Sequence, residues 1–385
     1  MKIVQLLIEH GADVSIPGGE YGTALHAAAA SRYPDEAIQV MELLLNHGAK
    51  VDQQGGSKWE TALHVACYEG TIEAVQFLLD YGADVNAEGG SRFGTPLRAA
   101  AARLHWRVSD SEEAKLRIME MLIDNGVKVN QQSGECGTAL QAACLHEEDA
   151  PVHLLLDNGA DVNARGGKNG TALMAACIGD NTELVRLLLD RGADVNARAE
   201  EHGTALMVAC QYKDDSDLPQ TTIEAVQLLL DRGADHSAVR YAATHRFGHD
   251  NADVLQLLLD QDGIDVNRVH EEYSTALHTM MNIHNDWAVE IGDNMQNWRN
   301  GVDILFKHGI APNAMSDKLG SALHVACAIK HDDTHENIVA SCWGCVDVDF
   351  KSDKTKYLLE QCPGINVNAQ GGAFGSALQA AAYSG

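Results

Sequence analysis

The sequence has few basic residues and no long apolar segment. Its 385 residues include 28 Lys and Arg against 55 Asp and Glu, which gives a formal net charge of -27. Nucleic acid and anionic membrane surfaces are bound by clustered Lys and Arg, so we expect neither as a partner. No apolar run approaches the roughly 20 residues of a membrane span, and residues 1–5 do not open a secretory leader. We therefore expect a soluble, cytoplasmic protein.

Cysteine, proline and aromatic residues are also scarce. The chain has 9 Cys and 7 Pro, and 5% of its residues are aromatic. An odd number of cysteines agrees with a reducing compartment. With 45% hydrophobic residues, the composition is that of an ordered protein. The length predicts two or three globular domains, unless the chain is a repeat array.

Internal repeats decide between these architectures. The phrase Gly-Thr-Ala-Leu at residues 22–25 returns with small changes along the chain, each time followed by a pair of small residues and mostly by a leucine-rich segment. The steps between the first six occurrences are 33 to 43 residues, and further occurrences follow across longer gaps. The Thr of the phrase, or the Ser that replaces it, is found at Thr23, Thr61, Thr95, Thr138, Thr171, Thr204, Thr275, Ser321 and Ser376.

The phrase itself predicts a short first helix in each repeat. After Thr61, the residues Leu63, Ala66 and Cys67 fall on one helix face, and the Thr61 side chain can cap the free amides at the start. Small Ala and Cys side chains allow another helix to approach closely. At two of these starts a Gln three residues later completes a capping box, namely Gln141 and Gln379.

The leucine-rich segment predicts a second helix. In residues 71–82, Ile72, Val75, Leu78 and Leu79 form an apolar stripe, and Gly82 has the place of the left-handed residue that ends a helix. The Asn-Ala-Glu-Gly-Gly segment that follows is rich in turn formers. We expect it to join one repeat to the next as an extended finger.

These two phrases resemble the ankyrin repeat, whose first helix carries Thr-Pro-Leu-His and whose second helix ends in Leu-Leu-Gly-Ala-Asp-Val-Asn. Both signatures recur in order about nine times, near the 33-residue period of that family. The resemblance implies an all-α solenoid of stacked helix-turn-helix units with β-turn fingers. The Gly-Gly-x-aromatic-Gly phrasing at residues 18–28 and 371–381 also resembles the arrays of fungal NACHT-type immune-receptor-like proteins.

The repeats predict two regions of different regularity. Residues 1–237 form a regular array that begins with a partial repeat, and residues 238–385 hold divergent repeats with long insertions and end in a partial repeat. Residues 239–245 occupy a first-helix position without the signature. Insertions between the first and second helices are predicted at residues 31–37, 103–115, 212–222, 282–301 and 329–354; the last two contain Trp287, Trp298 and Trp343, which could simply anchor these loops.

Most candidate catalytic residues fall on repeated positions. One slot of the first helix holds Cys67, Cys144, Cys177, Cys210 and Cys327, and other repeats fill it with Ala or Met. Packing explains these cysteines, so we expect no nucleophilic or redox role for them. A second slot holds His26, His64, His278 and His324, each three residues after a capping Thr or Ser. We expect these histidines to act as hydrogen-bonding braces rather than as catalysts.

The longest insertion contains the strongest local cluster of chemistry-bearing residues. His331, His335, Cys342 and Cys345 are zinc-ligand types in a His-x3-His-x6-Cys-x2-Cys pattern. A zinc-stapled loop or a metal-dependent enzyme centred on residues 329–354 is therefore one alternative, and a purely architectural spacer is another. Because this single cluster has no second support in the sequence, we predict no metal site, no cofactor and no catalytic residue.

The residues of the fingers vary more from repeat to repeat than the two helix phrases do. Just before each Thr-Ala-Leu phrase the fingers carry pairs that differ in charge and often include an aromatic residue. We predict that a row of finger residues binds a protein partner and that the isolated chain is monomeric. The predicted binding residues are Glu20, Tyr21, Lys58, Trp59, Arg92, Phe93, Glu135, Lys168, Glu201, His202, Glu272 and Tyr273. The protein is predicted to be a non-catalytic interaction scaffold, and the region that recognises partners within a larger receptor-like or signalling protein.

Overall fold

The structure is a computed structural model in which short helices alternate along the chain. It describes residues 1–18, 22–31, 33–55, 60–90, 94–102, 111–132, 137–145, 149–168, 170–200, 203–210, 220–235, 238–242, 251–261, 263–268, 275–281, 291–328, 348–373 and 375–384. Contacts divide the chain into two compact units, Met1–Val208 and Ala209–Gly385, and each is considered by itself. The predicted division at residue 237 follows the regularity of the repeats and remains a prediction.

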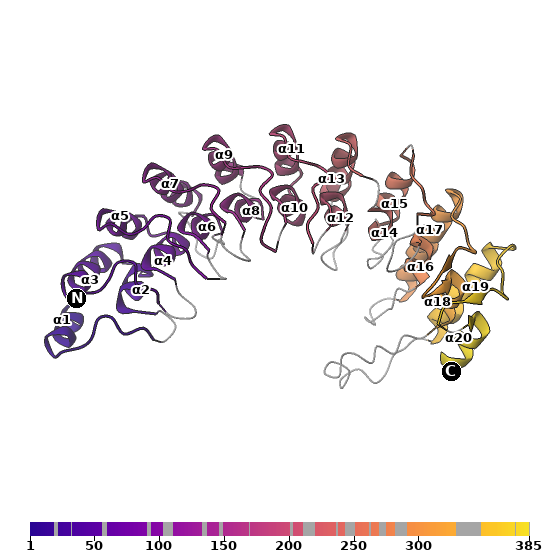
Figure 1. Ribbon diagram of the computed structural model, residues 1–385, viewed down its shortest axis with the longest axis horizontal. Helices are drawn as coiled ribbons and strands as arrows, with labels where there is room; N and C mark the ends of the chain where they lie inside the picture. The colour runs from indigo at the N-terminus through magenta and orange to yellow at the C-terminus, as the bar shows by residue number, and fades with distance from the viewer. Residues whose placement is uncertain are drawn as a thin grey trace. The chain divides into compact units, whose positions relative to one another are not determined.

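Each repeat has a first and a second helix, as the periodicity predicts. In the unit Met1–Val208, α4, α6, α8 and α10 lie in one row, and α5, α7, α9 and α11 lie in another (Figure 1). The first helices are α2 (Ala24–Ala29), α4 (Ala62–Glu69), α6 (Pro96–Ala101), α8 (Ala139–Cys144), α10 (Ala172–Ile178), α12 (Ala205–Ala209), α14 (Val239–Ala242), α16 (Ala276–Met281), α18 (Ala322–Cys327) and α20 (Ala377–Ser384).

The second helices are mostly longer than the first ones, and most of them pack against the first helix of the same repeat, as α5 does against α4 and α11 against α10. They are α1 (Lys2–Glu9), α3 (Pro34–Asn46), α5 (Ile72–Asp80), α7 (Ser111–Asp124), α9 (Asp149–Asp157), α11 (Thr182–Asp190), α13 (Gln220–Asp231), α15 (Asn251–Leu259), α17 (Ile291–Lys307) and α19 (Val348–Gln361). Two fingers contain two-residue antiparallel strand pairs, β1 (Met315–Ser316) with β2 (Gly320–Ser321) and β3 (Gln370–Gly371) with β4 (Gly375–Ser376). The all-α repeat architecture is thereby confirmed.

The core of each repeat is a leucine pair. The Leu of the Thr-Ala-Leu phrase is almost fully buried in complete repeats, as in Leu63 at 0% exposure, and so is the Leu four residues before the helix-ending Gly, as in Leu78. Burying such a side chain contributes about 1.5–3 kcal/mol. The same two slots are exposed in the partial repeats, at Leu7 (56%) and Leu378 (78%). Packing between the two helices of a repeat therefore creates the core.

An asparagine at the base of most fingers joins each repeat to the next. Asn130 Nδ2 donates to the carbonyl of Gly159 at 2.9 Å, and Asn130 Oδ1 accepts from the amide of Asp161 at 2.7 Å. Asn163 makes the same two bonds to Gly192 and Asp194. Because each amide side chain satisfies one backbone donor and one acceptor of the following repeat, the finger bases are held at a fixed spacing.

The structure agrees with one expectation about the divergent repeats and corrects another. The degenerate segment at 239–245 does begin with a helix, α14, which packs on α15 and α16. The predicted insertions are wrong in extent, because their last residues belong to second helices: α3 starts at Pro34, α7 at Ser111 and α17 at Ile291. In α7, Glu112 and Glu113 of the first turn are exposed, so their polarity is compatible with a helix.

Candidate recognition surface

The first helices begin with a side-chain brace between neighbouring repeats. The Thr61 amide donates to His64 Nδ1 at 3.3 Å, which leaves the proton of the neutral ring on Nε2. In the same arrangement His26 Nε2 lies 2.7 Å from the carbonyl of Glu60, and His278 Nε2 lies 3.0 Å from that of Gly320. Each ring therefore joins the start of its own helix to the end of the next finger, which confirms the predicted bracing role.

Burial keeps these rings neutral. Burial is the main cause that lowers the pKa of His64 from 6.5 to about 4, while hydrogen bonds to the backbone of Gly94 and Ala87 oppose the shift. Burial likewise lowers the pKa values of His26 and His278, against the opposing effect of their carbonyl partners. A buried imidazole held at both nitrogens in this way is not available for proton transfer to a substrate.

Other side chains in this slot show which part of the brace is needed. Gln141 Oε1 accepts from the Thr138 amide at 2.7 Å, and its Nε2 donates to the carbonyls of Ala164 and Gly170 at 3.0 and 2.7 Å. Glutamine thus replaces both imidazole nitrogens. Met174 cannot make these bonds, and its sulfur lies beside Gly170 instead. The slot requires a side chain that fills the space under the next finger, and polar bonds add to that packing.

The predicted finger row lies mostly outside the described residues. This applies to Glu20, Tyr21, Lys58, Trp59, Arg92, Phe93, Glu135, Glu201, His202, Glu272 and Tyr273, while Lys168 is described and exposed. In several fingers a backbone hydrogen bond joins the residues on either side of this variable pair. The Gly166 amide, for example, donates to the carbonyl of Gly170 at 3.2 Å across the finger that carries Lys168. The row therefore has fixed ends between which side chains vary.

A second row was missed by the sequence-based reasoning. It comprises the residue that follows the small Ala or Cys slot of each first helix, and in the unit Met1–Val208 it contains Ala30, Tyr68, Ala102, Leu145 and Ile178. These side chains are half-buried, whereas almost all the preceding residues of α4, α8 and α10 are buried. The signal was present in the sequence, because this slot varies from Ala to Tyr directly after a pair of small Ala or Cys residues.

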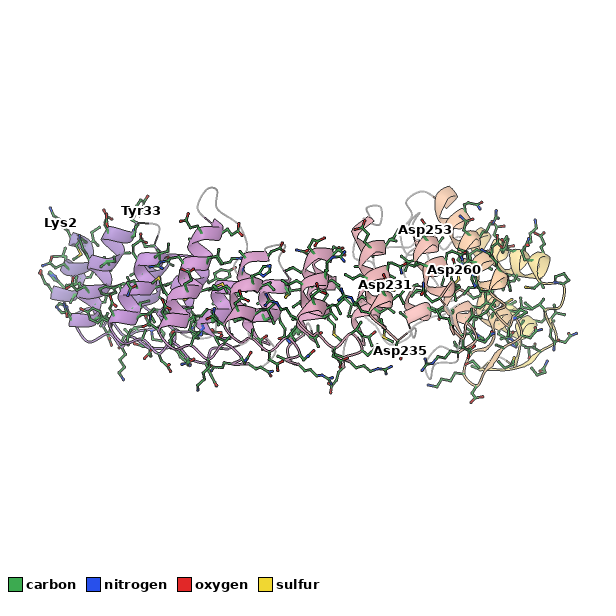
Figure 2. The ribbon with its side chains drawn as sticks, turned by 90° about the horizontal axis from the view of Figure 1, so that it is seen from above. Lys2, Tyr33, Asp231, Asp235, Asp253 and Asp260 are labelled. Atoms are coloured by element: carbon green, nitrogen blue, oxygen red, sulfur yellow. The ribbon has the colours of Figure 1, made fainter. Side chains whose placement is uncertain are left out.

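The acidic residues of the repeat phrase have a structural role. In Gly-Ala-Asp-Val-Asn, the Asp carboxylate accepts from the amide two residues later, as Asp161 does from Asn163 at 2.9 Å. In the unit Ala209–Gly385, Asp235 has this turn position, while Asp231 and Asp260 lie at the C-terminal ends of α13 and α15 (Figure 2). Asp231 and Asp260 each accept from a Gln side chain four residues earlier, at 2.7 and 2.6 Å. Arg268 lies 3.7 Å from Asp235, an exposed pairing that contributes about 0–1 kcal/mol. Much of the net charge therefore belongs to the repeat frame.

Comparison with known proteins identifies the family of these repeats. The family described as ankyrin repeats (3 copies) matches residues 1–89, 104–199, 152–240 and 175–270, which together span more than half of the chain. The chain belongs to the ankyrin-repeat family. A similar solved structure is the crystal structure of the human ASB11 ankyrin repeat domain, with 27% identity and a TM-score of 0.45 over 60% of this chain and 92% of that one. No curated protein matches the chain.

The cysteines of this ankyrin array are packing residues. Cys67, Cys144 and Cys177 are buried in first helices, and Cys210 is buried directly after α12. Burial raises the pKa values of the Cys67 and Cys144 thiols well above their usual range, so both stay protonated. A protonated, buried thiol is a poor nucleophile and a poor metal ligand. The packing interpretation of this slot therefore agrees with its geometry.

One of the predicted loop tryptophans is a core residue, while Trp287 and Trp343 lie outside the described residues. Trp298 in α17 is 1% exposed, and its Nε1 donates to the carbonyl of Met280 at 3.2 Å. Its ring meets Tyr357 of α19 edge to face, with 5.6 Å between ring centroids. Trp298 therefore joins α16, α17 and α19 within the unit Ala209–Gly385. Because it is buried, it is not part of a binding surface.

The candidate zinc ligands His331, His335, Cys342 and Cys345 also lie outside the described residues. Among the residues that the structure does describe, no group of three His, Cys, Asp or Glu side chains could hold a metal ion. Within the same part of the chain, no helix is long and apolar enough to cross a membrane.

Purified protein is expected to contain far less than one zinc per chain, because only one loosely spaced set of ligand types is present. Elemental analysis of the dialysed protein measures this directly. One zinc per chain that is lost in a Cys342→Ser, Cys345→Ser double variant, but kept in a Cys362→Ser control, would contradict the expectation and favour the stapled-loop alternative.

Proposed function

We propose that this chain is a non-catalytic protein-recognition scaffold whose binding surface follows the finger row. Ankyrin repeats are generally protein–protein interaction modules, and the family is typically non-catalytic. The observation that carries the proposal is the contrast between a rigid frame and variable finger residues. Neighbouring fingers are tied at both ends by the Asn and His or Gln bonds, while the residues between those ends change in charge and aromatic character.

A fixed frame with variable side chains is suited to recognition because little conformational entropy is lost when the frame binds. The second and third fingers each carry a basic and an aromatic residue, Lys58 with Trp59 and Arg92 with Phe93. The partner class that fits this end of the row is a protein segment with acidic residues and apolar anchors. A chain with a net charge of -27 offers few other cationic places of this kind.

The wider setting is part of the same proposal. The chain would act as the recognition region of a larger receptor-like or signalling protein in the cytoplasm, and as a monomer when isolated. The phrasing of residues 18–28 and 371–381 supports a relation to fungal NACHT-type proteins. Acidic composition disfavours nucleic acid and membrane partners.

With a partner identified by affinity capture, Trp59→Ala and Phe93→Ala are each expected to weaken the complex through faster dissociation. Truncating a buried aromatic anchor costs on the order of 2 kcal/mol or more. Lys58→Glu combined with Arg92→Glu is expected to slow association in a salt-dependent way, since rim charges chiefly steer the encounter. Biolayer interferometry at two salt concentrations measures both rates.

Two control variants separate the finger row from the rest of the surface. Tyr81→Ala removes an aromatic side chain that is 43% exposed at the end of α5, and Lys50→Glu reverses an exposed charge. Neither should change binding. If the four finger substitutions leave binding intact in folded protein while Tyr68→Ala abolishes it, recognition lies on the second row, which contains Tyr68. If none has an effect, recognition along either row is rejected and the spacer alternative gains support.

A further inference from the structure

The second and third fingers form a distinct pair. The second finger is defined here as residues 55–60 and the third as residues 89–94. Each is closed by a backbone bond across five residues, from the Gly55 amide to the Glu60 carbonyl at 2.9 Å and from the Gly89 amide to the Gly94 carbonyl at 2.7 Å. The finger at 166–170 closes across four residues. The pair also shares a Gly-Gly-Ser-basic-aromatic phrase.

Glu60 is the unusual residue of this pair. It stands where other fingers end in glycine, and those glycines, Gly22, Gly94, Gly137, Gly170, Gly203, Gly320 and Gly375, all have φ between +72° and +76°. Glu60 does not adopt such a φ, and it is only 7% exposed. Glycine ends seven other fingers and Ser274 takes the same place before Thr275, so closure alone does not explain a buried carboxylate here. Burying a charged group is costly unless it is paired.

The contacts of Glu60 reach both fingers. Its carbonyl, at the end of the second finger, accepts from the Gly55 amide and from His26 Nε2. Its carboxylate lies against Gly89 at the start of the third finger, since a Cβ added at Gly89 would collide with it. Oε2 of the same carboxylate is 3.3 Å from His64 Nε2.

His64 extends this connection to the other end of the third finger. Its ring lies close to the backbone of Ala87, just before the third finger, and of Gly94 at the end of that finger. The brace from a first-helix residue to the next finger is common to the repeats, as the Gln141 bonds show. The carboxylate between two fingers is an addition to that common pattern in this pair.

We propose that Glu60 is a positioning residue that couples the second and third fingers, so that they keep one mutual arrangement and bind as a single unit. This inference rests on the proposed function for its biological meaning, while the coupling itself is a property of the free protein. A coupled pair of fingers loses less conformational freedom on binding than two independent ones. Glu60 is thereby expected to act through the fingers and not by contact with the partner.

A double-mutant cycle between Glu60 and Gly89 tests the coupling without any partner. Gly89→Ala should lower the urea unfolding midpoint in the Glu60 background, because the new methyl group displaces the carboxylate. In the Glu60→Gly background the same change should have little effect. The chain itself contains this combination, with Gly170 ending one finger and Ala199 beginning the next. The finger of Ala199 is still closed, by the Ala199 amide and the Gly203 carbonyl at 2.8 Å. Equal shifts in both backgrounds would reject the contact.

Hydrogen exchange then distinguishes coupling from a local structural role. In Glu60→Gly, exchange of the Gly89 and Gly90 amides should accelerate by about tenfold or more, because the third finger loses its contact with the second. Glu60→Gln keeps the shape and one acceptor oxygen, and it should restore most of the protection. In the Glu60 background, Gly89→Ala should also accelerate exchange at Gly55, across the two fingers. That cross-finger effect should vanish in Glu60→Gly.

Unchanged exchange at Gly89 and Gly90 in folded Glu60→Gly would overturn the inference. That result would leave the proposed function standing, because the binding assay with Trp59 and Phe93 variants does not depend on coupling. Conversely, a failed binding assay would not alter the exchange result.

Discussion

Trp298→Ala is expected to destabilise the unit Ala209–Gly385 by about 3–5 kcal/mol, the usual cost of removing a large buried aromatic side chain. The ring is 1% exposed, its Nε1 bonds to the Met280 carbonyl, and Lys354 Nζ lies 5.7 Å from its centroid. Truncation would leave a cavity among α16, α17 and α19 together with an unpaired carbonyl. Urea unfolding followed by circular dichroism, with local hydrogen exchange of these helices, measures the loss.

Two variants calibrate this result. Trp298→Phe keeps most of the apolar volume but loses the indole donor, so it should cost distinctly less, on the order of 1–3 kcal/mol. Tyr33→Ala removes an aromatic residue that is 70% exposed at the start of α3 (Figure 2) and should be nearly neutral. If Trp298→Ala costs no more than Tyr33→Ala, the tryptophan does not have the anchoring role assigned to it.

The stability of the unit Met1–Val208 is expected to fall as the pH is lowered from about 6.5 towards 4, with a contribution of at most about 3 kcal/mol from His64. The Glu60 carboxylate, 3.3 Å from His64 Nε2, reduces this contribution because it favours the protonated ring. Burial lowers the pKa of this histidine to about 4. Between these values the unfolded chain binds a proton on His64 that the folded chain does not bind. Unfolding therefore takes up a proton, and acid favours it. The contribution is fully present above the unfolded pKa and is lost as the pH falls through this window.

His64→Gln removes the titrating group while keeping a side chain that the array already accepts in this slot at Gln141. The variant should be near wild-type in stability at pH 7.5 and should show a clearly shallower loss between pH 6.5 and 4.5. His26, whose pKa burial also lowers, leaves part of the slope in place. His47→Gln, on the exposed end of α3, makes the same substitution away from the brace. Equal slopes for wild type and His64→Gln in urea titrations would refute this account.

The repeat architecture could be predicted because its signals are local and repeated. A capping Thr, an apolar stripe and a helix-ending Gly specify each short helix from neighbouring residues, and Thr61 and Gly82 occupy the expected places, with φ of +81° at Gly82. Because these signals recur along the chain, a repeat that lacks one of them can still be located from its neighbours. The degenerate repeat at α14 was placed correctly for this reason. The bracing histidines followed from the same reasoning, since His64 stands three residues after a capping Thr.

Features that depend on neighbouring repeats were not determined by the sequence. The insertion bounds were wrong because α17 begins at Ile291, inside the predicted insertion, and Trp298 is buried by contacts with other helices. Glu60 looked like an ordinary charged residue before a capping Thr. Its burial against Gly89 and His64 appears only when the second and third repeats are stacked. Sequence alone determined the helices and their order, because short-range rules govern them; side-chain environments were decided by the tertiary structure, because stacking brings together residues some 30 positions apart.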